Sequence, residues 1–334
     1  MTPVPRRVTG FTLVELLVAL GISSLVIAWL FGLLSAALNT LRTHDALADL
    51  QERGRYALAS IESDLQMAGY FGLSHAGSSF RFLISGDPAA AVPAAQLRQQ
   101  QAPAPGVPAG AQSCGDNYAV DLSVPIQGDN NRFMLGPHRS PACNARGGAR
   151  SGADTLTVRR AVSSTTVPEV GRLQLLVDRY DAQRRFVLAD GILPVGLVPS
   201  PDQLQLHDLQ LNSYYIANDS DGRAGWPALR VKTLTRVGVN PTFVDTELMS
   251  GIEDLQLQFQ TDGGYADPGQ LPPGAVVRAV RVWLRIGAAA AEPGFVDARR
   301  YHYADVDFTP TGAERGQRRL LVSRTIALRN APLD

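Results

Sequence analysis

The sequence lacks several features that would point to common functions. Its 334 residues carry no net charge, because 31 lysines and arginines balance 31 aspartates and glutamates. A neutral chain has no overall field to concentrate phosphate polymers, so nucleic acid is not expected as a partner. The chain has only two cysteines and no CxxC motif or Cys/His cluster, which argues against a zinc site.

Catalytic signatures are also missing. The chain has no P-loop, no GxGxxG and no HExxH motif, and "GLSHAG" at 72–77 departs from the G-x-S-x-G pattern of hydrolases. The five histidines are scattered along the chain: His44, His75, His138, His207 and His302. We therefore expect no enzyme, no catalytic residue, no cofactor and no resident metal.

The acidic stretch "NDSDGRAGW" at 218–226 has a superficial likeness to a calcium loop through Asn218, Asp219 and Asp221. It lacks the D-x-D-x-D-G spacing and the distant bidentate glutamate that calcium loops use. An ordinary turn, held by an Asx-type hydrogen bond, is the expected structure.

A long apolar run is present at the N-terminus. The 23 residues from Leu16 to Leu38 contain no charge, and about 20 apolar residues are enough for a helix to cross a membrane. Arg6 and Arg7 precede the run, so the N-terminal side is expected in the cytoplasm and the remainder is exported. A cleaved secretory signal fits less well, because the run is too long and no A-x-A site follows it.

The helical pattern continues beyond the apolar run. Apolar or small residues recur at three- and four-residue steps: Leu47, Leu50, Gly54, Ala57, Leu58, Ile61, Leu65 and Ala68. This spacing predicts one helix from Phe11 to about Ala68, with an amphipathic second half that needs a domain to pack on. Gly69 marks its end, and we interpret Gly21, Gly32 and Gly54 as packing positions within it.

The N-terminus has a short basic leader ending in glycine, followed by "FTLVE" and about 20 apolar residues. This arrangement resembles the N-terminus of type IV prepilins and of the related type II secretion pseudopilins. It implies that a prepilin peptidase cleaves after Gly10 and that the new N-terminal Phe11 is methylated. It also implies that Glu15 matches the glutamate at the fifth mature position of that family.

Further stretches resemble PilW-like minor pilins. They are "QERGRYALASIESDLQMAGYFG" at 51–72, "GADTLTVRRA" at 152–161, "GIEDLQLQFQ" at 251–260, "VRAVRVWLRI" at 277–286 and "RRLLVSRTIALRN" at 318–330. The order of these stretches and the length of the chain carry the resemblance. It implies a minor pilin that takes part in priming and assembly of the type IV pilus and in its tip complex.

Glu15 is an isolated carboxylate in a segment suited to hydrocarbon, where a charge costs about 2.5 to 3.5 kcal/mol. Cleavage after Gly10 would give Phe11 a free α-amine close to it. The family resemblance and charge neutralisation together predict that Glu15 pairs with an N-terminal amine, its own or a neighbouring subunit's, during assembly.

The region after residue 113 changes to short alternating runs broken by glycine, proline and aspartate. In one run Leu255, Leu257 and Phe259 alternate with glutamines, and residues 280–286 alternate in the same way. One-sided strands predict an antiparallel sheet with one solvated face, and the amphipathic half of the first helix is the natural cover for its apolar face. The fold class is therefore α+β, and the resemblance to prepilins implies that it is pilin-like.

We expect four regions along the chain. Residues 1–10 are the leader, 11–41 the transmembrane or pilus-core half of the helix, 42–68 its amphipathic half, and 69–334 the exported β-rich domain. Residues 86–112 are rich in proline and alanine and read as a surface excursion without a core face. In an exported domain Cys114 and Cys143 predict one disulfide, with two free buried thiols as the alternative.

The expected location is the inner membrane, in a single pass with the C-terminal domain in the periplasm, and then the pilus. Expected partners are the other minor pilins, the major pilin, the prepilin peptidase, the inner-membrane assembly platform and a tip adhesin. Two other functions stay open. One is a J-type pseudopilin of type II secretion, and the other is a tip module that binds a surface or DNA through residues 86–112 or the loop between the cysteines.

Overall fold

The structure is a computed structural model of the whole chain. It describes residues 12–74, 77–84, 86–93, 122–133, 143–165, 167–188, 190–200, 202–272 and 274–331. The chain divides into two compact units, residues 1–49 and residues 50–334. Each unit is described separately below.

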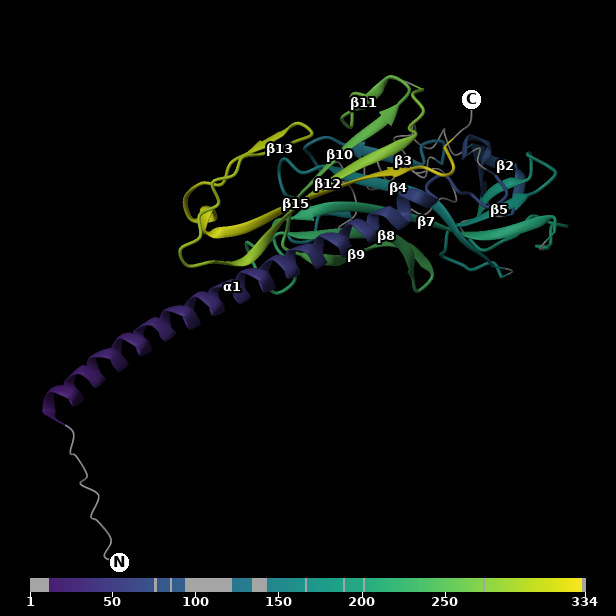
Figure 1. The fold of residues 1–334 in the computed structure, drawn as a ribbon. Coiled ribbons are helices and arrows are strands. Elements are labelled where there is room, and N and C mark those ends of the chain that lie inside the picture. Colours follow the sequence, from purple (N-terminus) through teal and green to yellow (C-terminus); the bar gives the residue numbers. More distant parts are fainter. Residues whose placement is uncertain are drawn as a thin grey trace, which may run out of the picture. The chain divides into compact units, whose positions relative to one another are not determined.

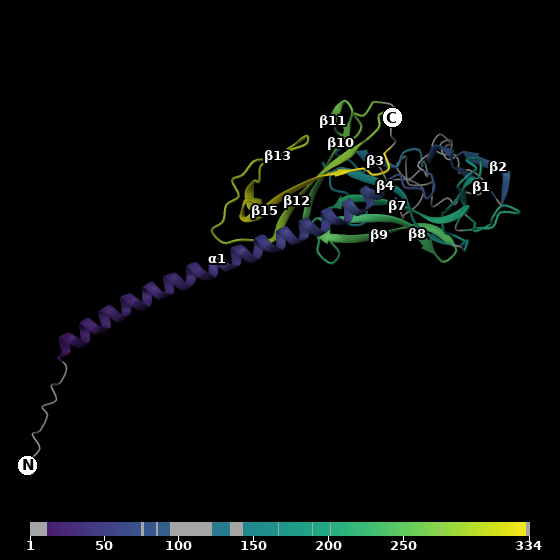
Figure 2. The ribbon, with the colours of Figure 1, turned by 45° about the vertical axis from the view of Figure 1, so that its right-hand side comes forward.

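One α-helix, α1 (Leu13–Met67), begins in the first unit and ends in the second. Its 55 residues confirm the long N-terminal helix expected from the sequence. In the second unit Figures 1 and 2 both show the last turns of α1 beside strands β7, β12 and β15. The helix stops before Gly69, which has a positive φ of 74° that a residue with a side chain rarely adopts.

The larger sheet contains nine strands within the described residues. They are β1 (Arg81–Ile84), β2 (Asp87–Pro93), β3 (Ile126–Asp129), β4 (Thr155–Thr165), β5 (Gln174–Asp178), β6 (Arg185–Leu188), β7 (Leu204–Ala217), β8 (Ala228–Val237) and β9 (Asn240–Ser250). The main order is β2-β1-β6-β5-β7-β4-β3, with β8 on β7 and β9 on β8. The β1–β6 pair is parallel and the other pairs are antiparallel, so this sheet is mixed.

The smaller sheet has four antiparallel strands in the described chain. In order across the sheet they are β11 (Gly264–Ala266), β10 (Ile252–Thr261), β12 (Ala279–Ala291) and β15 (Gln317–Ala327). Leu255 lies opposite Leu284 and Leu257 opposite Val282, and all four side chains are fully buried. The apolar face expected for Leu255, Leu257 and Phe259 and for residues 280–286 is therefore present. The expectation that the opposite face is solvated is wrong for part of this sheet, because Asp254, Gln256 and Arg285 are also buried there.

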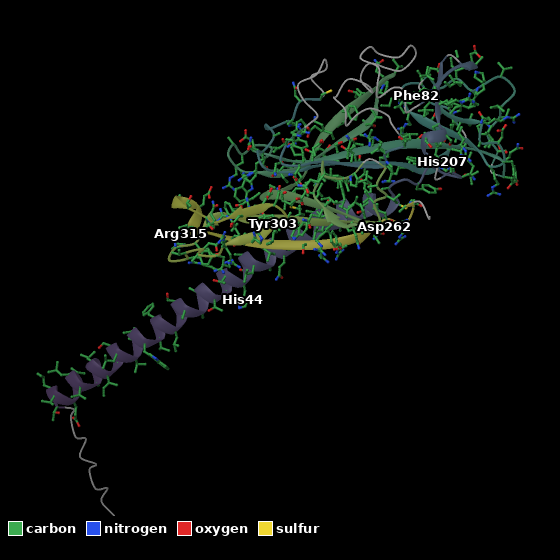
Figure 3. The ribbon with its side chains drawn as sticks, turned by 90° about the horizontal axis from the view of Figure 1, so that it is seen from above. His44, Phe82, His207, Asp262, Tyr303 and Arg315 are labelled. Carbon is green, nitrogen blue, oxygen red and sulfur yellow. The ribbon has the colours of Figure 1, made fainter. Side chains whose placement is uncertain are left out.

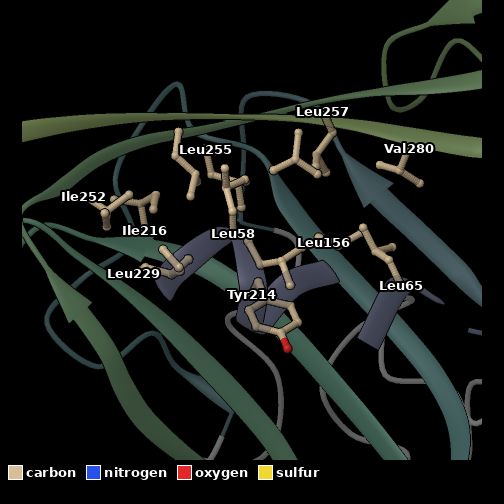
Figure 4. Close-up of a cluster of buried hydrophobic side chains, with 14 of the residues drawn as sticks. Leu58, Leu65, Leu156, Tyr214, Ile216, Leu229, Ile252, Leu255, Leu257 and Val280 are labelled. Atoms are coloured by element: carbon tan, nitrogen blue, oxygen red, sulfur yellow. The ribbon is translucent and has the colours of Figure 1, made fainter. Parts of the chain in front are cut away.

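The main core lies where α1 and the two sheets meet. Helix residue Leu58 lies among Tyr214 and Ile216 of the larger sheet and Leu255 of the smaller one, and Leu65 lies toward Leu156 of the larger sheet and Val280 of the smaller one (Figure 4). These side chains are at least nine-tenths buried. The predicted stripe of the helix is thus used, but it packs between two sheets and not on one face of a single sheet. Neither sheet alone could cover the stripe, because the helix contributes buried residues toward both.

The larger sheet extends beyond α1 over two further cores. One gathers aromatic residues such as Phe71, Phe80 and Phe82, and the other lies between β1, β6 and the start of β7. A short 3₁₀ helix, Gly77–Ser79, precedes β1. Figure 3 shows Phe82 and His207 toward one end of this unit and Tyr303 and Arg315 toward the other.

A small hairpin covers part of the smaller sheet. It consists of β13 (Tyr301–Tyr303) and β14 (Val306–Phe308), and a second 3₁₀ helix, Gly312–Gly316, leads from it into β15. Arg285 donates to the Tyr303 hydroxyl at 2.5 Å, and that hydroxyl donates to Asp254 at 2.6 Å. Burial, and then the Asp254 charge, raise the pKa of Tyr303 far above its usual range, so it stays a donor.

Two details differ from the expectations. Residues 87–93 at the start of the proline- and alanine-rich stretch form β2, which pairs with β1, and Ala91 packs against the third core. An edge position accommodates the prolines of this strand, because a strand at the edge needs fewer N–H donors. Residues 94–112 lie outside the described chain. Strand β9 was not expected, since Pro241 and the acidic Asp245 and Glu247 obscure its pattern.

Candidate assembly site

The first candidate element is the beginning of α1. The Glu15 carboxylate accepts hydrogen bonds from the Thr12 backbone N–H at 2.9 Å and from the Thr12 hydroxyl at 3.1 Å. The Glu15 N–H in turn donates to the Thr12 hydroxyl oxygen at 3.3 Å. This reciprocal pair is a capping box, which satisfies N–H groups that have no partner within the helix.

Thr12 was missed as a functional residue, although a signal for it is present in the sequence. The pattern T-x-x-E directly before an apolar run is the signature of a capping box. Gly10 and Phe11 lie outside the described residues, so cleavage after Gly10 stays a prediction. The pairing of Glu15 with a free N-terminal amine also stays a prediction, and in this structure the Glu15 carboxylate is bonded to Thr12.

The second element is the apolar surface of the first unit. Every described side chain from Thr12 to Leu41 is exposed, and most are Leu, Val, Ile, Ala or Phe. A shallow groove on this surface is lined by Ile27, Leu30, Phe31 and Leu34, which recur at helical spacing. By length and composition α1 can cross a membrane. A helix that is apolar on all sides needs lipid or other helices around it.

The third element anchors the second half of α1 in the globular unit. Asp64 is 4% exposed and accepts three hydrogen bonds, from Arg160 Nε at 2.8 Å, Asn212 Nδ2 at 2.5 Å and the Tyr214 hydroxyl at 2.6 Å. Burial, and then the Asp64 charge, raise the pKa of Tyr214 well above its ordinary value. Donors from β4 and β7 therefore fix how the helix is rotated about its own axis.

Close packing supports this anchor along the helix. A Cβ added at Gly54 would lie 3.2 Å from Ile286 Cδ1 and 3.3 Å from Val322 Cγ2, so the glycine lets α1 approach β12 and β15. Gly54 is thus a packing position, as expected. Added Cβ atoms at Gly21 and Gly32 meet nothing within 4 Å, so their packing role stays a prediction for the assembled state.

The Leu-Arg-Asn ending has a structural role next to the end of α1. Asn330 Nδ2 donates to the Ala68 carbonyl at 3.2 Å, and Leu328 packs on the main core. The last carbonyls of a helix lack partners within the helix. The C-terminal residues therefore cap α1 and tie the end of the chain to it.

The remaining candidates have local roles in the described chain. Asp219 Oδ1 accepts from the Gly225 N–H at 2.6 Å, six residues further on, so this bond closes a loop and is not the expected Asx-type turn. Asp221 forms ion pairs with Arg146 and Arg230. Among the described residues no group of three histidine, cysteine, aspartate or glutamate side chains is arranged to hold a metal. The described histidines are His44, His207 and His302, and His207 is buried with its ring nitrogens bonded to Val162 O and Gln205.

Cys143 is fully buried in the aromatic core and is disulfide-bonded. Cys114 lies outside the described residues. The pairing of the two cysteines therefore stays a prediction.

Comparisons with known protein families match two parts of this chain, one at the N-terminus and one in the C-terminal part. Residues 213–330 match the family described as Type IV Pilus-assembly protein W, and residues 5–31 match the Prokaryotic N-terminal methylation motif. The stretches at 251–260, 277–286 and 318–330 lie inside the first match, whereas those at 51–72 and 152–161 lie outside both. No curated protein matches the chain.

One solved structure similar to the chain is a type IV-like pilin from Thermus thermophilus. It is 12% identical with a TM-score of 0.30, and the match covers 55% of this chain and 83% of that one. A superposition at this level adds nothing to the fold described above.

The long apolar helix, the methylation motif and the α+β domain define the class. The chain is a type IV pilin-like protein. Within that class it is PilW-like, since the match to this family runs from β7 through β15.

Proposed function

We propose that this chain is a minor pilin that takes part in priming and assembly of the type IV pilus and in its tip complex. The contrast between the two halves of α1 carries the proposal. The described side chains of residues 12–41 are all exposed, whereas residues 50–68 are anchored in a globular unit. A protein built in this way presents an apolar helix to other helices while the folded unit stays in water. The proposed role is structural and not enzymatic.

The proposed route begins in the inner membrane, with the β-rich unit in the periplasm. The prepilin peptidase cleaves after Gly10 and Phe11 is methylated. The assembly platform then brings the helix together with those of the other minor pilins and the major pilin. A tip adhesin is a further proposed partner.

Deletion of the gene tests this role. Surface pili are expected to disappear or to fall sharply, and piliation should return when the gene is restored. Normal piliation in the deletion strain would contradict the proposal. The alternative role in type II secretion predicts instead that secreted enzymes stay in the periplasm while pili are unaffected.

Glu15→Gln tests the proposed assembly contact. The substitution removes the negative charge but keeps the shape, so cleavage after Gly10 is expected to proceed and incorporation into pili to fall at least about tenfold, the equivalent of about 1.4 kcal/mol. Mass spectrometry of the mature N-terminus measures cleavage, and immunoblots of sheared pili measure incorporation.

Glu52→Gln is the matched control, because Glu52 is an exposed glutamate on the same helix outside the apolar half. It should leave both readouts unchanged. Equal incorporation of the Glu15→Gln chain and the parental chain would refute the pairing with an N-terminal amine.

A further inference from the structure

The smaller sheet ends in a long strand with one open edge. The strand order is β11-β10-β12-β15, so among the described residues β15 has a partner strand only on its β12 side. An edge strand carries backbone N–H and C=O groups that can pair with a strand of another chain. The 11 residues of β15 offer enough length for such pairing.

The register shows which backbone groups face the open edge. The Leu328 N–H donates to the Arg278 carbonyl, which places Leu328 on the β12 side. Successive residues of an antiparallel strand direct their backbone groups to alternate sides, so Leu321, Ser323 and Thr325 direct theirs outward. The Arg319 carbonyl, which falls in the same series, accepts from the Arg299 side chain. None of the three outward residues has a backbone bond on that side within the described chain.

The face of the sheet next to this edge carries an aromatic and cationic cluster. Trp283 lies directly across from Ser323, and Arg281 lies across from Thr325. The Arg281 guanidinium sits 4.1 Å from the centre of the Tyr265 ring and 5.6 Å from that of Trp283. Trp, Tyr and Arg are the residue types that contribute most to binding energy at protein interfaces.

Charge distinguishes Arg281 from the other arginines of this face. Arg285 and Arg319 are buried and share the Glu253 carboxylate beneath the β13–β14 hairpin. Arg281 donates to the Thr325 hydroxyl and has no carboxylate partner in the described chain. An incoming strand that runs along β15 would pass beside this cation, which favours a strand with a carboxylate at that point.

The other edges are less suitable. Strand β2 contains Pro88 and Pro93, which lack an N–H, and β11 has only three residues. Strand β9 is as long as β15, but its Asp245 already pairs with Arg230 and Lys232. No described edge other than that of β15 combines length with a cation that lacks a carboxylate partner.

We propose that β15 receives an extended strand of a partner protein, with an acidic side chain of that strand placed over Arg281. The partner adds to the sheet through backbone hydrogen bonds and gains specificity from Arg281 and Trp283. The inference rests on the proposed assembly role in one respect: the partner is sought among the components of the pilus.

Site-specific cross-linking in cells tests the proposal. A photo-reactive phenylalanine analogue replaces Ser323 in the full-length chain, and the products are mapped by mass spectrometry. We expect a cross-link to one extended, acidic segment of another pilus component. Thr325→Pro removes one outward N–H and is expected to lower the yield about tenfold, the loss that one interfacial backbone hydrogen bond can produce.

Thr325→Ala is the matched comparison, because it also removes the hydroxyl that accepts from Arg281 but keeps the N–H, and it should lower the yield less than Thr325→Pro does. Proline is tolerated at an edge position whose N–H faces outward. If Thr325→Pro proves unstable, Arg281→Glu is tested in its place, and Arg281→Lys is the control. The cross-link is expected to be lost in Arg281→Glu and kept in Arg281→Lys.

Three results would overturn the inference. They are a cross-link that survives both Thr325→Pro and Arg281→Glu, a cross-link to a second copy of this chain, and no cross-link at position 323. The amount of parental chain in sheared pili separates this outcome from failure of the proposed function. A parental chain that enters pili without a proline-sensitive cross-link contradicts only the inference about β15.

Discussion

The two halves of α1 share one helical backbone but differ in whether their apolar side chains are buried within the chain. The first half is apolar around its whole circumference and has no buried described side chain up to Leu41, whereas the second half buries a stripe that includes Leu50, Leu58 and Ile61. Both are good helices, so helix propensity does not distinguish them. The difference shows that the position of the apolar residues, and not their number, decides whether a helix packs within its own chain or needs other surroundings.

The buried anchor gives the largest expected effect on this contrast. Asp64→Ala removes the carboxylate partner of the half-buried Arg160 and deprives the buried Asn212 and Tyr214 of their acceptor, so the free energy of unfolding should fall by about 3–5 kcal/mol. Chemical denaturation of the full-length protein in detergent, followed by tryptophan fluorescence, measures the loss. Ser63→Ala, at an exposed neighbouring position, should change it by less than about 0.5 kcal/mol. A loss of similar size in both variants would refute the anchor.

A pair of large-to-small substitutions compares the two halves directly. Ile61→Ala empties a fully buried position and should lower the free energy of unfolding by about 2–5 kcal/mol. Leu25→Ala removes a side chain that is 72% exposed, so the same unfolding transition should be nearly unchanged. Its effect is expected in the incorporation of the chain into pili. Equal destabilisation by the two substitutions would show that the halves are not distinct.

Two glycines sharpen the comparison further. Gly54→Val adds a side chain where even a Cβ is in tight contact with Ile286 and Val322, and overpacking of this kind costs about 1–3 kcal/mol. Gly21→Val meets open space in the single chain and should leave the unfolding transition of the β-rich unit unchanged. Thermal unfolding of both variants measures the difference. A destabilised Gly21→Val chain would mean that the first half packs within its own chain.

Much of the fold could be read from the sequence because it depends on local periodicity. The helix, its glycine stop and the one-sided strands around Leu257 and Val282 follow from residues within one turn or one pleat. The parts that were missed depend on distant neighbours. Asp64 meets Arg160 and Asn212, which lie 96 and 148 positions away in the chain. Strand β9 was missed because its Asp245 and Glu247 obscure the strand pattern, and the cation that pairs with them, Arg230, belongs to β8.

The candidate site divides in the same way. Gly10, Phe11 and Glu15 form a contiguous motif, and the capping role of Thr12 was also readable from T-x-x-E. The edge of β15 was not, because a strand sequence does not reveal which of its sides has a neighbour. The role of Asn330 likewise required the knowledge that the end of the chain returns to the end of α1.

The sequence by itself determined that the chain has an apolar helix suited to lipid or to other helices, followed by a β-rich unit, since both follow from the spacing of apolar residues. Only the tertiary structure decided that the amphipathic half of α1 lies between two sheets and is held by Asp64. The tertiary structure also decided that, among the described residues, the edge of β15 beside Arg281 and Trp283 has no partner strand. The physical reason is that periodicity fixes which face of an element is buried, while long-range contacts fix which element covers that face.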